Sequence, residues 1–390
     1  MPIKLIIAQS NLTLMGGAER VLLKIAQRYN AKIYTAEYEP NNTFEEFKDL
    51  DVQTIGRSSL LKLLPYGRIS QGLNYGLAFY NLKLKEDYDV INAHMAPSHW
   101  IRNKNKRVLW YCHTPLRDVY DLYEYRLSLK KPYQRPIYKI GINAIKRIDQ
   151  NIVKKIEFIF ANSKNTESRI VKYYERKDAE VLNGGINYKE FKNNGDYKYF
   201  IYPSRISPNK RQEYAISAFK KFRAKLSAKE KDKYKLIICG AVSKDKAFQE
   251  YYKKIKEEVR KTRNIQIITD ASEKKLALLY SRATAVLYPP LNEDYGLVPL
   301  EAMASEKPVI AVNEGGPKET VVHGKTGFLV NSDDEMAEKM KYIAEHPSIA
   351  NNIGRNGRKR VEENYSWEVF FKKFDKKLQE IKKGRKIEDR

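Results

Sequence analysis

The chain of 390 residues, 42% of them hydrophobic, is longer than one core usually supports, so two globular domains are expected. Its 73 Lys and Arg residues exceed its 48 Asp and Glu residues, and the net charge of +25 favours anionic partners: phosphorylated small molecules, an anionic membrane face or nucleic acid. No apolar run reaches the ~18 residues of a membrane span, and the N-terminus turns polar too early for a signal peptide. Cys112 and Cys239 lie in apolar runs, so we expect a soluble, cytoplasmic protein without a disulfide.

Short β-rich runs alternate with longer helical segments along the whole chain, which predicts an α/β protein with parallel sheets covered by helices. The predicted strands are residues 3–9, 31–38, 89–94, 107–113, 157–163, 199–205, 235–241, 265–270, 285–290 and 308–314. Ligands of such sheets bind beyond the carboxyl ends of the strands, so the residues that follow the strands are the candidate site residues.

The two halves of this pattern are separated by residues 183–198, which are rich in Asn, Gly and charged side chains, as linkers are. We therefore predict a Rossmann-like domain over residues 1–190, a second one over residues 191–365 and a final helix over residues 366–390. Apolar residues recur along one face of that helix: Trp367, Phe370, Phe371, Phe374, Leu378 and Ile381. Its first half is expected to pack on the second domain and its Lys-rich end to return to the first.

Gly16 and Gly17 follow the first predicted strand and precede a helix that begins near Ala18. Glycines at this point let a ligand approach the backbone closely, and the helix N-terminus offers unpaired N–H groups to an anion. Turn formation alone would also explain the two glycines, so both interpretations stay open.

His94 and His113 each follow a strand of the first half. An imidazole at such a position can form a hydrogen bond with a sugar hydroxyl or a phosphate. We expect a structural role for His94. We expect a functional role for His113, because Thr-Pro and an Arg-Asp pair follow it.

Arg205 follows the first strand of the second half, and Lys210 comes five residues later, after a Ser-Pro turn. Two cations at the end of a strand can hold a diphosphate, because Arg forms forked hydrogen bonds and Lys acts as a point charge. In a chain this basic, a chance pair of surface cations is the alternative interpretation.

The segment from Pro289 to Ala304 runs from a strand through a Pro-Pro turn into a helix that begins near Leu297. Glu293 precedes this helix, and Glu301 lies about one turn inside it. Helix capping explains Glu293 but not Glu301, whose neighbours are apolar and which needs a partner if it is buried. Carboxylates accept hydrogen bonds from sugar hydroxyls, and the N–H groups at the start of the helix attract an anion.

Gly315 and Gly316 form another tight turn between a strand and a helix, and Glu319 falls in the first turn of that helix, where an acid interacts with the helix dipole. Residues 331–335 are Asn-Ser-Asp-Asp-Glu, a run that invites a metal-binding interpretation. Because a helical segment follows these acids, a helix N-terminus is the favoured interpretation. We therefore expect no metal site.

In this order and spacing, the motifs resemble the retaining GT-B glycosyltransferases of glycosyltransferase family four (group 1). The resemblance covers nearly the whole chain and rests on GGAER, the two histidines, ANSKNTESRIVKYY, NGGINYKEF, RISPNK, the two glutamates, GGPKETVVHGKTGFLV and ENYSW. The stretch YCHTPLRDVYDLYEY is similar to a subgroup of mannosyltransferases that often use GDP-mannose. The resemblance implies two Rossmann-like domains facing each other across a cleft, the first for the acceptor and the second for the nucleotide-sugar donor.

The resemblance also implies roles for the residues that bind the nucleotide. Arg205 and Lys210 would hold the donor diphosphate, helped by the backbone around Gly16 and Gly17. Glu301 would bind the ribose hydroxyls. The base would lie near Ile268, Thr269 and Asp270.

The transferred sugar would contact Glu293 and His113, the two residues expected to be catalytic. It would also lie near the backbone N–H groups of Tyr295, Gly296 and Leu297. Breaking the sugar–phosphate bond builds charge on the nucleoside diphosphate, which fixed cations and helix N–H groups stabilise, so no divalent metal or further cofactor is obligatory. The resemblance implies attack on the face from which the diphosphate departs, so Glu293 is expected to stabilise the sugar without a covalent bond.

The expected reaction is transfer of a hexose, with mannose from GDP-mannose as the first expectation. A UDP-sugar-dependent glucosyl-, galactosyl- or N-acetylglucosaminyltransferase is the alternative donor class. An epimerase or phosphorylase of the same fold is disfavoured by the two spaced glutamates. A nucleic-acid-binding module is disfavoured because carboxylates at the site would repel a phosphate backbone.

The acceptor is expected to be a glycan or a polyprenyl-linked saccharide at an anionic membrane face. Residues 60–85 mix apolar residues with lysines, and Leu73, Leu77, Tyr80 and Leu84 share a helical face. Packing inside the first domain and a peripheral membrane contact both explain this face. Between Ile101 and Lys155, 14 Lys and Arg residues exceed 4 Asp and Glu residues, a balance of +10 that suits either a solubilising surface or an anion-facing patch.

Overall fold

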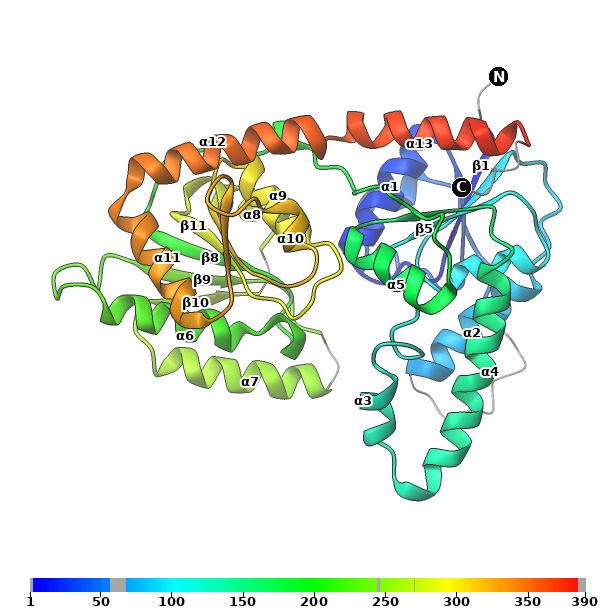
Figure 1. The fold of residues 1–390 in the computed structure, drawn as a ribbon, viewed down its shortest axis with the longest axis horizontal. Coiled ribbons are helices and arrows are strands. Elements are labelled where there is room, and N and C mark those ends of the chain that lie inside the picture. The colour runs from blue at the N-terminus through cyan, green and yellow to red at the C-terminus, as the bar shows by residue number, and fades with distance from the viewer. Residues whose placement is uncertain (1–2, 57–67, 244–245, 270, 385–390) are drawn as a thin grey trace. The chain divides into compact units, whose positions relative to one another are not determined.

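The structure, a computed structural model, describes residues 3–56, 68–243, 246–269 and 271–384. The chain forms two compact units, each a sheet covered by helices (Figure 1). Unit 1 comprises Met1–Gly184 and Phe371–Arg390, and unit 2 comprises Gly185–Phe370. The sequence analysis placed the boundary between the domains at residue 190, inside the same linker.

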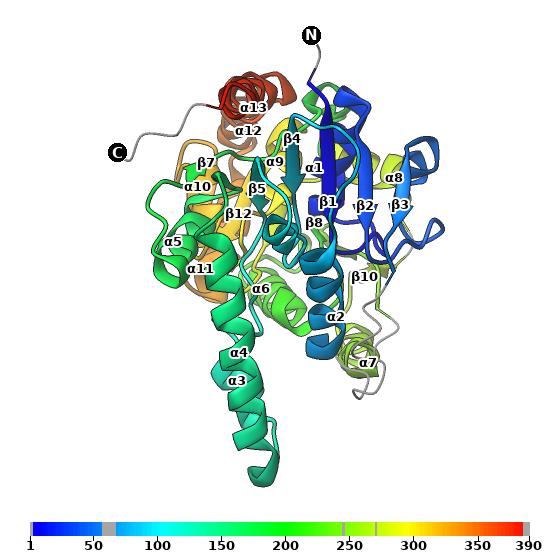
Figure 2. The same cartoon turned by 90° about the vertical axis from the view of Figure 1, so that its right-hand side faces the viewer.

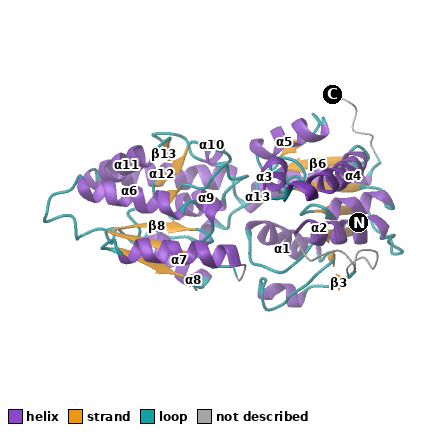
Figure 3. Cartoon of the chain, turned by 90° about the horizontal axis from the view of Figure 1, so that it is seen from below, coloured by secondary structure: helices purple, strands orange, loops and turns teal. Residues whose placement is uncertain are grey.

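Unit 1 contains a parallel sheet of seven strands in the order β3-β2-β1-β4-β5-β6-β7. Its strands are β1 (Leu5–Gln9), β2 (Lys32–Thr35), β3 (Val52–Thr54), β4 (Val90–Ala93), β5 (Val108–Cys112), β6 (Phe158–Ala161) and β7 (Glu180–Val181). Its helices are α1 (Gly17–Tyr29), α2 (Arg68–Asn81), α3 (Tyr123–Ser128), α4 (Arg135–Val153) and α5 (Lys164–Tyr174), with 3-10 turns η1 (Glu45–Asp49), η3 (Ser98–Asn103) and η4 (Pro132–Gln134). The inner strands are continuous apolar runs because helices cover both faces of the sheet (Figure 3).

Unit 2 contains a parallel sheet of six strands in the order β10-β9-β8-β11-β12-β13. Its strands are β8 (Tyr199–Pro203), β9 (Lys235–Cys239), β10 (Ile265–Ile268), β11 (Ala285–Tyr288), β12 (Val309–Val312) and β13 (Gly327–Val330). Its helices are α6 (Gln212–Ala224), α7 (Lys246–Arg260), α8 (Glu273–Arg282), α9 (Leu297–Ala304), α10 (Pro317–Thr320), α11 (Asp333–Glu345) and α12 (Pro347–Asn364), with 3-10 turns η5 (Tyr188–Glu190) and η6 (Pro208–Lys210). The predicted α/β fold with parallel sheets is confirmed.

Every strand predicted from the sequence overlaps an observed strand, but β3, β7 and β13 were not predicted. β3 and β7 are strands at the edges of a sheet with three and two residues, too few for a recognisable pattern, whereas β13 has four residues, as many as β4. Cys112 and Cys239 are buried in β5 and β9, as the core interpretation predicts.

Helix α13 (Trp367–Lys382) joins the two units, because its residues from Phe371 onward belong with unit 1. In unit 2, a Cβ atom at Gly185 would lie 2.6 Å from the Trp367 ring, so the start of the helix lies directly on the linker. In unit 1, the Phe374 ring packs 6.1 Å from Tyr29 and 6.2 Å from Phe160, between ring centroids.

The proposed membrane-contact segment, residues 60–85, lies partly outside the described residues, since residues 57–67 are not described. In the described part, Leu73 and Tyr80 of α2 pack against the core of unit 1 and Leu84 is buried, which supports the packing interpretation. Within the described residues, no helix combines the length and the apolar character that crossing a membrane requires.

Candidate functional site

The candidate site in unit 2 lies where the strand order reverses. Strands β8 and β11 are neighbours in the sheet although they are far apart in the chain, so the loops that follow them begin side by side. The loop after β8 carries Arg205 and Lys210, and the loop after β11 carries Glu293. In open α/β sheets this reversal point is the usual place for a ligand.

Lys210 and Glu293 form an ion pair between these two loops. Their side chains are 12% and 24% exposed, so the pair is partly protected from water. The backbone joins the same loops, since the Leu291 N–H donates to the Asn209 carbonyl over 2.9 Å. The structure thus brings together two residues that the sequence placed 83 positions apart.

A third loop, after β12, holds the Glu293 loop from the other side. The Gly316 N–H donates to the Glu293 carbonyl over 2.8 Å. Gly315 has φ +57°, and a Cβ atom there would lie 2.3 Å from the same carbonyl oxygen. The two glycines are therefore required by the close approach of the loops as well as by the turn that the sequence predicted.

A carboxylate in this third loop links all three loops. Glu314 accepts a hydrogen bond from Arg211 over 2.9 Å and another from the Asn292 N–H over 3.2 Å. Arg211 follows Lys210 directly, and Asn292 precedes Glu293. Lys210 and Glu293 thus lie on a cross-linked set of loops, which limits their movement.

Helix α9 begins at Leu297, as predicted, and Gly296 is its N-cap residue. Gly296 has φ +81°, and a Cβ atom there would lie 2.8 Å from the hydroxyl oxygen of Tyr288. Tyr295 is buried, so only its backbone and that of the next residues are suited to face a ligand. The first N–H groups of a helix carry partial positive charge, so this end of α9 favours an anion.

Glu301 lies one turn inside α9 and is partly buried, while its neighbours Leu300 and Ala302 are fully buried. The hydroxyl group of Tyr280 donates to Oε2 of Glu301 over 2.6 Å. Tyr280 of α8 is therefore a hydrogen-bond partner of the kind that a partly buried Glu301 needs. No pattern in the sequence of α8 indicated it, because only the fold places α8 beside α9.

Arg205 is exposed, and within the described residues its side chain forms no ion pair. Ile268 ends β10, the edge strand, and Thr269 follows it. Asp270, the third residue predicted near the base, lies outside the described residues.

Unit 1 holds the two histidines at its own reversal point, where β4 is the neighbour of β1. Nδ1 of His94 lies 3.0 Å from Nε2 of His113, and Nε2 of His94 lies 2.8 Å from Oδ1 of Asn92. His94 is completely buried between these partners, which agrees with the structural role expected for it. His113 is 8% exposed.

This chain of contacts determines which nitrogen of His113 carries the hydrogen. Asn92 Oδ1 is an acceptor, so Nε2 of His94 carries hydrogen and its Nδ1 is an acceptor. Nε2 of His113 therefore donates to His94, and the remaining nitrogen, Nδ1 of His113, is left with a lone pair. In this tautomer Nδ1 of His113 has the chemistry of a hydrogen-bond acceptor.

Burial also keeps both imidazoles neutral. Burial lowers the pKa of His113 to about 3. Burial, together with the neighbouring His113, lowers the pKa of His94 well below its usual value. At neutral pH the pair therefore carries no charge, so His113 does not act as a cation.

Gly16 and Gly17 lie at the start of α1, as predicted, since Gly17 is its first residue and Gly16 its N-cap. Glu19, in the first turn, is 4% exposed, and its Oε2 would lie 2.6 Å from a Cβ atom at Gly16. The space that Gly16 leaves open is therefore occupied by a carboxylate of the chain itself.

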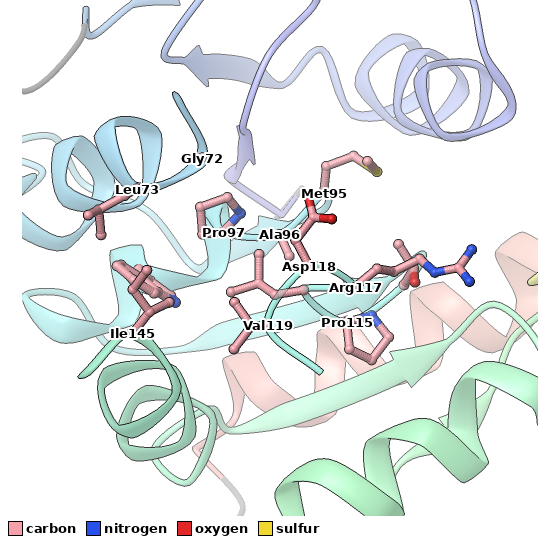
Figure 4. A pocket seen from close by; sticks show the side chains of 13 residues that line it. Gly72, Leu73, Met95, Ala96, Pro97, Pro115, Arg117, Asp118, Val119 and Ile145 are labelled. Carbon is pink, nitrogen blue, oxygen red and sulfur yellow. The ribbon is translucent and has the colours of Figure 1, made fainter. Parts of the chain in front are cut away.

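A pocket of about 220 Å³ lies in unit 1, beyond the carboxyl ends of β4 and β5. Its lining is mostly apolar: Gly72, Leu73, Met95, Ala96, Pro97, Trp100, Thr114, Pro115, Leu116, Arg117, Asp118, Val119 and Ile145. Figure 4 shows Leu73, Val119 and Ile145 gathered on one side, while Arg117 extends away from them. Oγ1 of Thr114 is buried and has no hydrogen-bond partner among the described residues.

The acids that invited a metal interpretation start helices instead. Ser332 caps α11, and Asp333 and Asp334 lie in its first turn, where both pair with Lys221. Glu319 lies in the first turn of α10, as predicted. Among the described residues, no group of three or more His, Cys, Asp or Glu residues is arranged to hold a metal ion.

Both halves of the chain match known glycosyltransferase families. Residues 15–190 match Glycosyltransferase Family 4, and residues 186–360 match Glycosyl transferases group 1. The chain is 32% identical to the alpha-1,3/1,6-mannosyltransferase ALG2 of Mus musculus, over 91% of each chain. It is 29% identical to the protein of the same name from Homo sapiens, again over 91% of each chain.

Solved structures share the fold over nearly the whole chain. Anabaena Alr3699/HepE in complex with UDP superposes with a TM-score of 0.74 at 17% identity, covering 97% of this chain and all (100%) of that one. Sucrose-phosphate synthase from Thermosynechococcus elongatus superposes with a TM-score of 0.76 at 19% identity, covering 98% of this chain and 100% of that one. At these identities the likeness concerns the GT-B glycosyltransferase fold alone.

Proposed function

Because the chain belongs to the glycosyltransferases of family four and group 1, we propose that it transfers mannose from GDP-mannose to a hydroxyl group of a glycan or lipid-linked acceptor. The activity of the curated relatives, which are named alpha-1,3/1,6-mannosyltransferases, supports the choice of sugar. The configuration at the sugar's reacting carbon is retained.

The main support for a donor site in unit 2 is the Lys210–Glu293 ion pair, which lies where the strand order reverses. A donor diphosphate competes with Glu293 for Lys210, because its charge is larger and its oxygens accept the same hydrogen bonds. Release of Glu293 from Lys210 would leave its carboxylate to accept hydrogen bonds from the sugar. Arg205, which is exposed at the same strand end, is the second cation for the diphosphate.

Further residues of unit 2 bind the rest of the donor in this proposal. The backbone N–H groups of Tyr295, Gly296 and Leu297 face the sugar phosphate at the N-terminus of α9. Glu301, oriented by Tyr280, accepts hydrogen bonds from the ribose hydroxyls. The base lies near the carboxyl end of β10, at Ile268 and Thr269 and their unplaced neighbour Asp270.

The chemistry requires charge stabilisation more than covalent catalysis. As the bond between sugar and phosphate breaks, negative charge grows on the diphosphate, and Arg205, Lys210 and the α9 N–H groups stabilise it. The leaving phosphate takes the proton of the attacking hydroxyl group on the same face. Glu293 stabilises the positive charge that develops on the sugar and forms no bond with it.

Unit 1 supplies the acceptor side. Its pocket of about 220 Å³ lies at the strand ends where ligands of parallel sheets bind, and its apolar lining suits the nonpolar parts of an acceptor. The unpartnered Thr114 hydroxyl gives that ligand one hydrogen-bond partner. His113, neutral and accepting through Nδ1, is proposed to contact the transferred sugar, with Gly16 and Gly17 near the diphosphate. These three residues belong to unit 1, so their contacts with the donor stay predictions.

A donor panel tests the proposal. GDP-mannose, GDP-glucose, UDP-glucose, UDP-galactose and UDP-N-acetylglucosamine are each incubated with the protein, and release of the nucleotide is measured with and without a short lipid-linked saccharide. We expect release from GDP-mannose, and we expect Glu293→Gln to reduce it by roughly a hundredfold or more. The matched control is Glu250→Gln, because Glu250 is an exposed acid on α7 of the same unit.

Two outcomes would contradict the proposal. Release from a UDP-sugar and not from GDP-mannose would move the enzyme to the UDP-dependent class. Detection of a mannosyl group attached to Glu293 by mass spectrometry of the trapped protein would replace same-face attack by a covalent mechanism. We further propose that the enzyme acts at the cytoplasmic face of a membrane, where it would meet a lipid-linked acceptor.

A further inference from the structure

A helical hairpin of unit 1 exposes apolar side chains that no described residue of the unit covers. The hairpin, defined here as residues 123–148, consists of α3, the turn η4 and most of α4. Figures 1 and 2 show α3 and the start of α4 projecting beyond the sheet of unit 1. Its exposed apolar residues, with their exposed fractions, are Tyr125 (59%), Leu129 (61%), Tyr133 (70%), Ile137 (76%) and Ile140 (71%).

Helix α4 has two apolar faces, and only one of them packs on the core of unit 1. Ile142 and Ile145 are buried in the core of unit 1, along one side of the helix. Ile137, Ile140 and Ala144 follow the spacing of three and four residues along another side, and all are exposed. The helix therefore needs only one of its two apolar faces to fold onto unit 1.

The charge around the exposed face has one sign. Between Tyr125 and Ile148 the chain has seven Lys and Arg residues and no Asp or Glu residue. These cations are Arg126, Lys130, Lys131, Arg135, Lys139, Lys146 and Arg147. Of these seven, only Arg126 forms an ion pair with a described residue, Asp118, over 2.6 Å. The others keep their charge available for an external anion.

The root of the hairpin is held by a buried carboxylate. Asp149 of α4 is completely buried and accepts four hydrogen bonds, at 2.7 to 2.9 Å, from His99, Trp100, Tyr120 and Tyr174. Such a network fixes α4 to η3 and α5. The exposed face is thus carried on a firmly anchored helix and not on a loose loop.

We propose that the exposed face of this hairpin docks on the surface of an anionic lipid bilayer, with its apolar side chains among the acyl chains and its cations at the lipid phosphates. Apolar residues beside unpaired cations are what an interfacial helix requires. A second copy of the chain is disfavoured as the occupant, because two such faces would repel each other. The inference rests on the proposed function in one respect: docking would bring a lipid-linked acceptor to the pocket that Ile145 of α4 helps to line.

Vesicle sedimentation tests the inference with the full chain and without donor or acceptor. The protein is mixed at low salt with phosphatidylcholine vesicles and with vesicles that also contain phosphatidylglycerol. We expect binding to the anionic vesicles that weakens as salt increases, and much weaker binding to the neutral ones. Absence of binding to the anionic vesicles would overturn the inference.

Two variants with matched controls locate the surface. Ile137→Ser with Ile140→Ser removes apolar contact without changing charge, and Lys130→Gln, Lys131→Gln, Arg135→Gln and Lys139→Gln remove charge. The charge variant is expected to weaken vesicle binding at least tenfold, since each cation near an anionic surface contributes about fivefold. The isoleucine variant is expected to weaken it at least tenfold as well, because two apolar side chains no longer leave water. The controls are exposed positions of unit 2: Leu278→Ser with Ile349→Ser, and Lys229→Gln, Lys231→Gln, Lys253→Gln and Lys254→Gln.

The remaining outcomes separate this inference from the proposed function. If both hairpin variants bind vesicles like their controls, the hairpin is not the docking surface. If the wild-type chain is a dimer that the isoleucine variant dissociates while vesicle binding is unchanged, the face is an interface between copies and the inference is wrong. Release of GDP from GDP-mannose, measured without vesicles, should be equal in all variants. Its failure in the wild type would contradict the proposed function and leave the vesicle result standing.

Discussion

Tyr280 of α8 donates its hydroxyl hydrogen to Oε2 of Glu301 on α9 over 2.6 Å. Tyr280 is fully buried, so its ring cannot turn toward solvent and its hydroxyl holds the carboxylate in one orientation. A glutamate that must present an oxygen to a ribose hydroxyl gains from this, because its rotamer is selected before the ligand binds. Tyr280 is therefore a positioning residue in the proposed donor site.

Removing that hydroxyl group should weaken donor binding without stopping the reaction. We expect Tyr280→Phe to raise KM for GDP-mannose by about threefold to tenfold, the range that one hydrogen bond contributes, with kcat little changed. Steady-state kinetics measure this split. The matched control is Tyr199→Phe, because the Tyr199 hydroxyl in the same unit also donates over 2.6 Å, to the Leu279 carbonyl of α8. Equal KM values in both variants would remove the positioning role.

Loss of the charge at Lys210 should affect the donor diphosphate. Lys210→Gln is expected to raise KM for GDP-mannose and Kd for GDP by roughly tenfold to a hundredfold, because a charged hydrogen bond to phosphate is lost. Isothermal titration with GDP measures the second quantity. Lys221→Gln is the control, since Lys221 also pairs with acids, Asp333 and Asp334, but on the outside of unit 2. Unchanged GDP affinity in Lys210→Gln would contradict the assignment.

A side chain at Gly315 should disturb the Glu293 loop. Gly315→Ala combines a strained positive φ with a Cβ atom only 2.3 Å from the Glu293 carbonyl oxygen. We expect loss of about 2 kcal/mol or more of stability and a fall in kcat larger than that loss explains. Gly324→Ala is the matched control, because its φ of +74° is equally unfavourable but its Cβ atom would meet nothing within 4 Å. Similar kcat values in the two variants would show that the contact with Glu293 has no catalytic consequence.

The buried histidines should make stability fall in mild acid. Burial lowers the pKa of His113 to about 3, so below the ordinary pKa of 6.5 the unfolded chain takes up a proton that the folded chain refuses. This contribution to stability is complete above pH 6.5 and is lost as pH falls toward 3, at about 1.4 kcal/mol per pH unit for each such histidine.

Urea unfolding at about pH 7.5 and about pH 5.5 measures this difference. We expect His94→Gln with His113→Gln to reduce the loss between the two pH values by about 1 to 3 kcal/mol. His346→Gln, at an exposed position, should leave the loss as it is in the wild type. If the double variant loses as much stability as the wild type, the two imidazoles are not held neutral.

Much of the fold could be predicted from local pattern alone. Buried strands of a parallel sheet are continuous apolar runs. These runs predicted the positions of ten strands and the polar residues that follow them. The starts of α9, α10 and α11 were predicted because glycines, acids and Ser332 mark helix N-termini over short distances. The short strands β3 and β7 were not predicted, because pairing with neighbouring strands, and not their own sequence, makes them strands.

The structure places Arg205, Lys210, Glu293, His94 and His113 after strands, as the sequence predicted, but the sequence did not predict their partners. That Lys210 pairs with Glu293, and that Tyr280 pairs with Glu301, depends on which strands and helices become neighbours. The tautomer of His113 likewise depends on Asn92, which accepts a hydrogen bond from His94. That contact affects His113 only because β4 and β5 are neighbours in the sheet, which brings the two histidines together.

The sequence by itself therefore determined the α/β fold, the glycosyltransferase family and the residue types at the strand ends, because these follow from periodicity, turn chemistry and motif order along the chain. Only the tertiary structure decided which charges and hydroxyl groups meet, and which apolar residues stay uncovered. Ile142 and Ile137 have the same side chain on the same helix, yet one is 2% exposed and the other 76%. The physical reason is that burial and pairing are properties of neighbours in space, and those neighbours come from parts of the chain far apart in sequence.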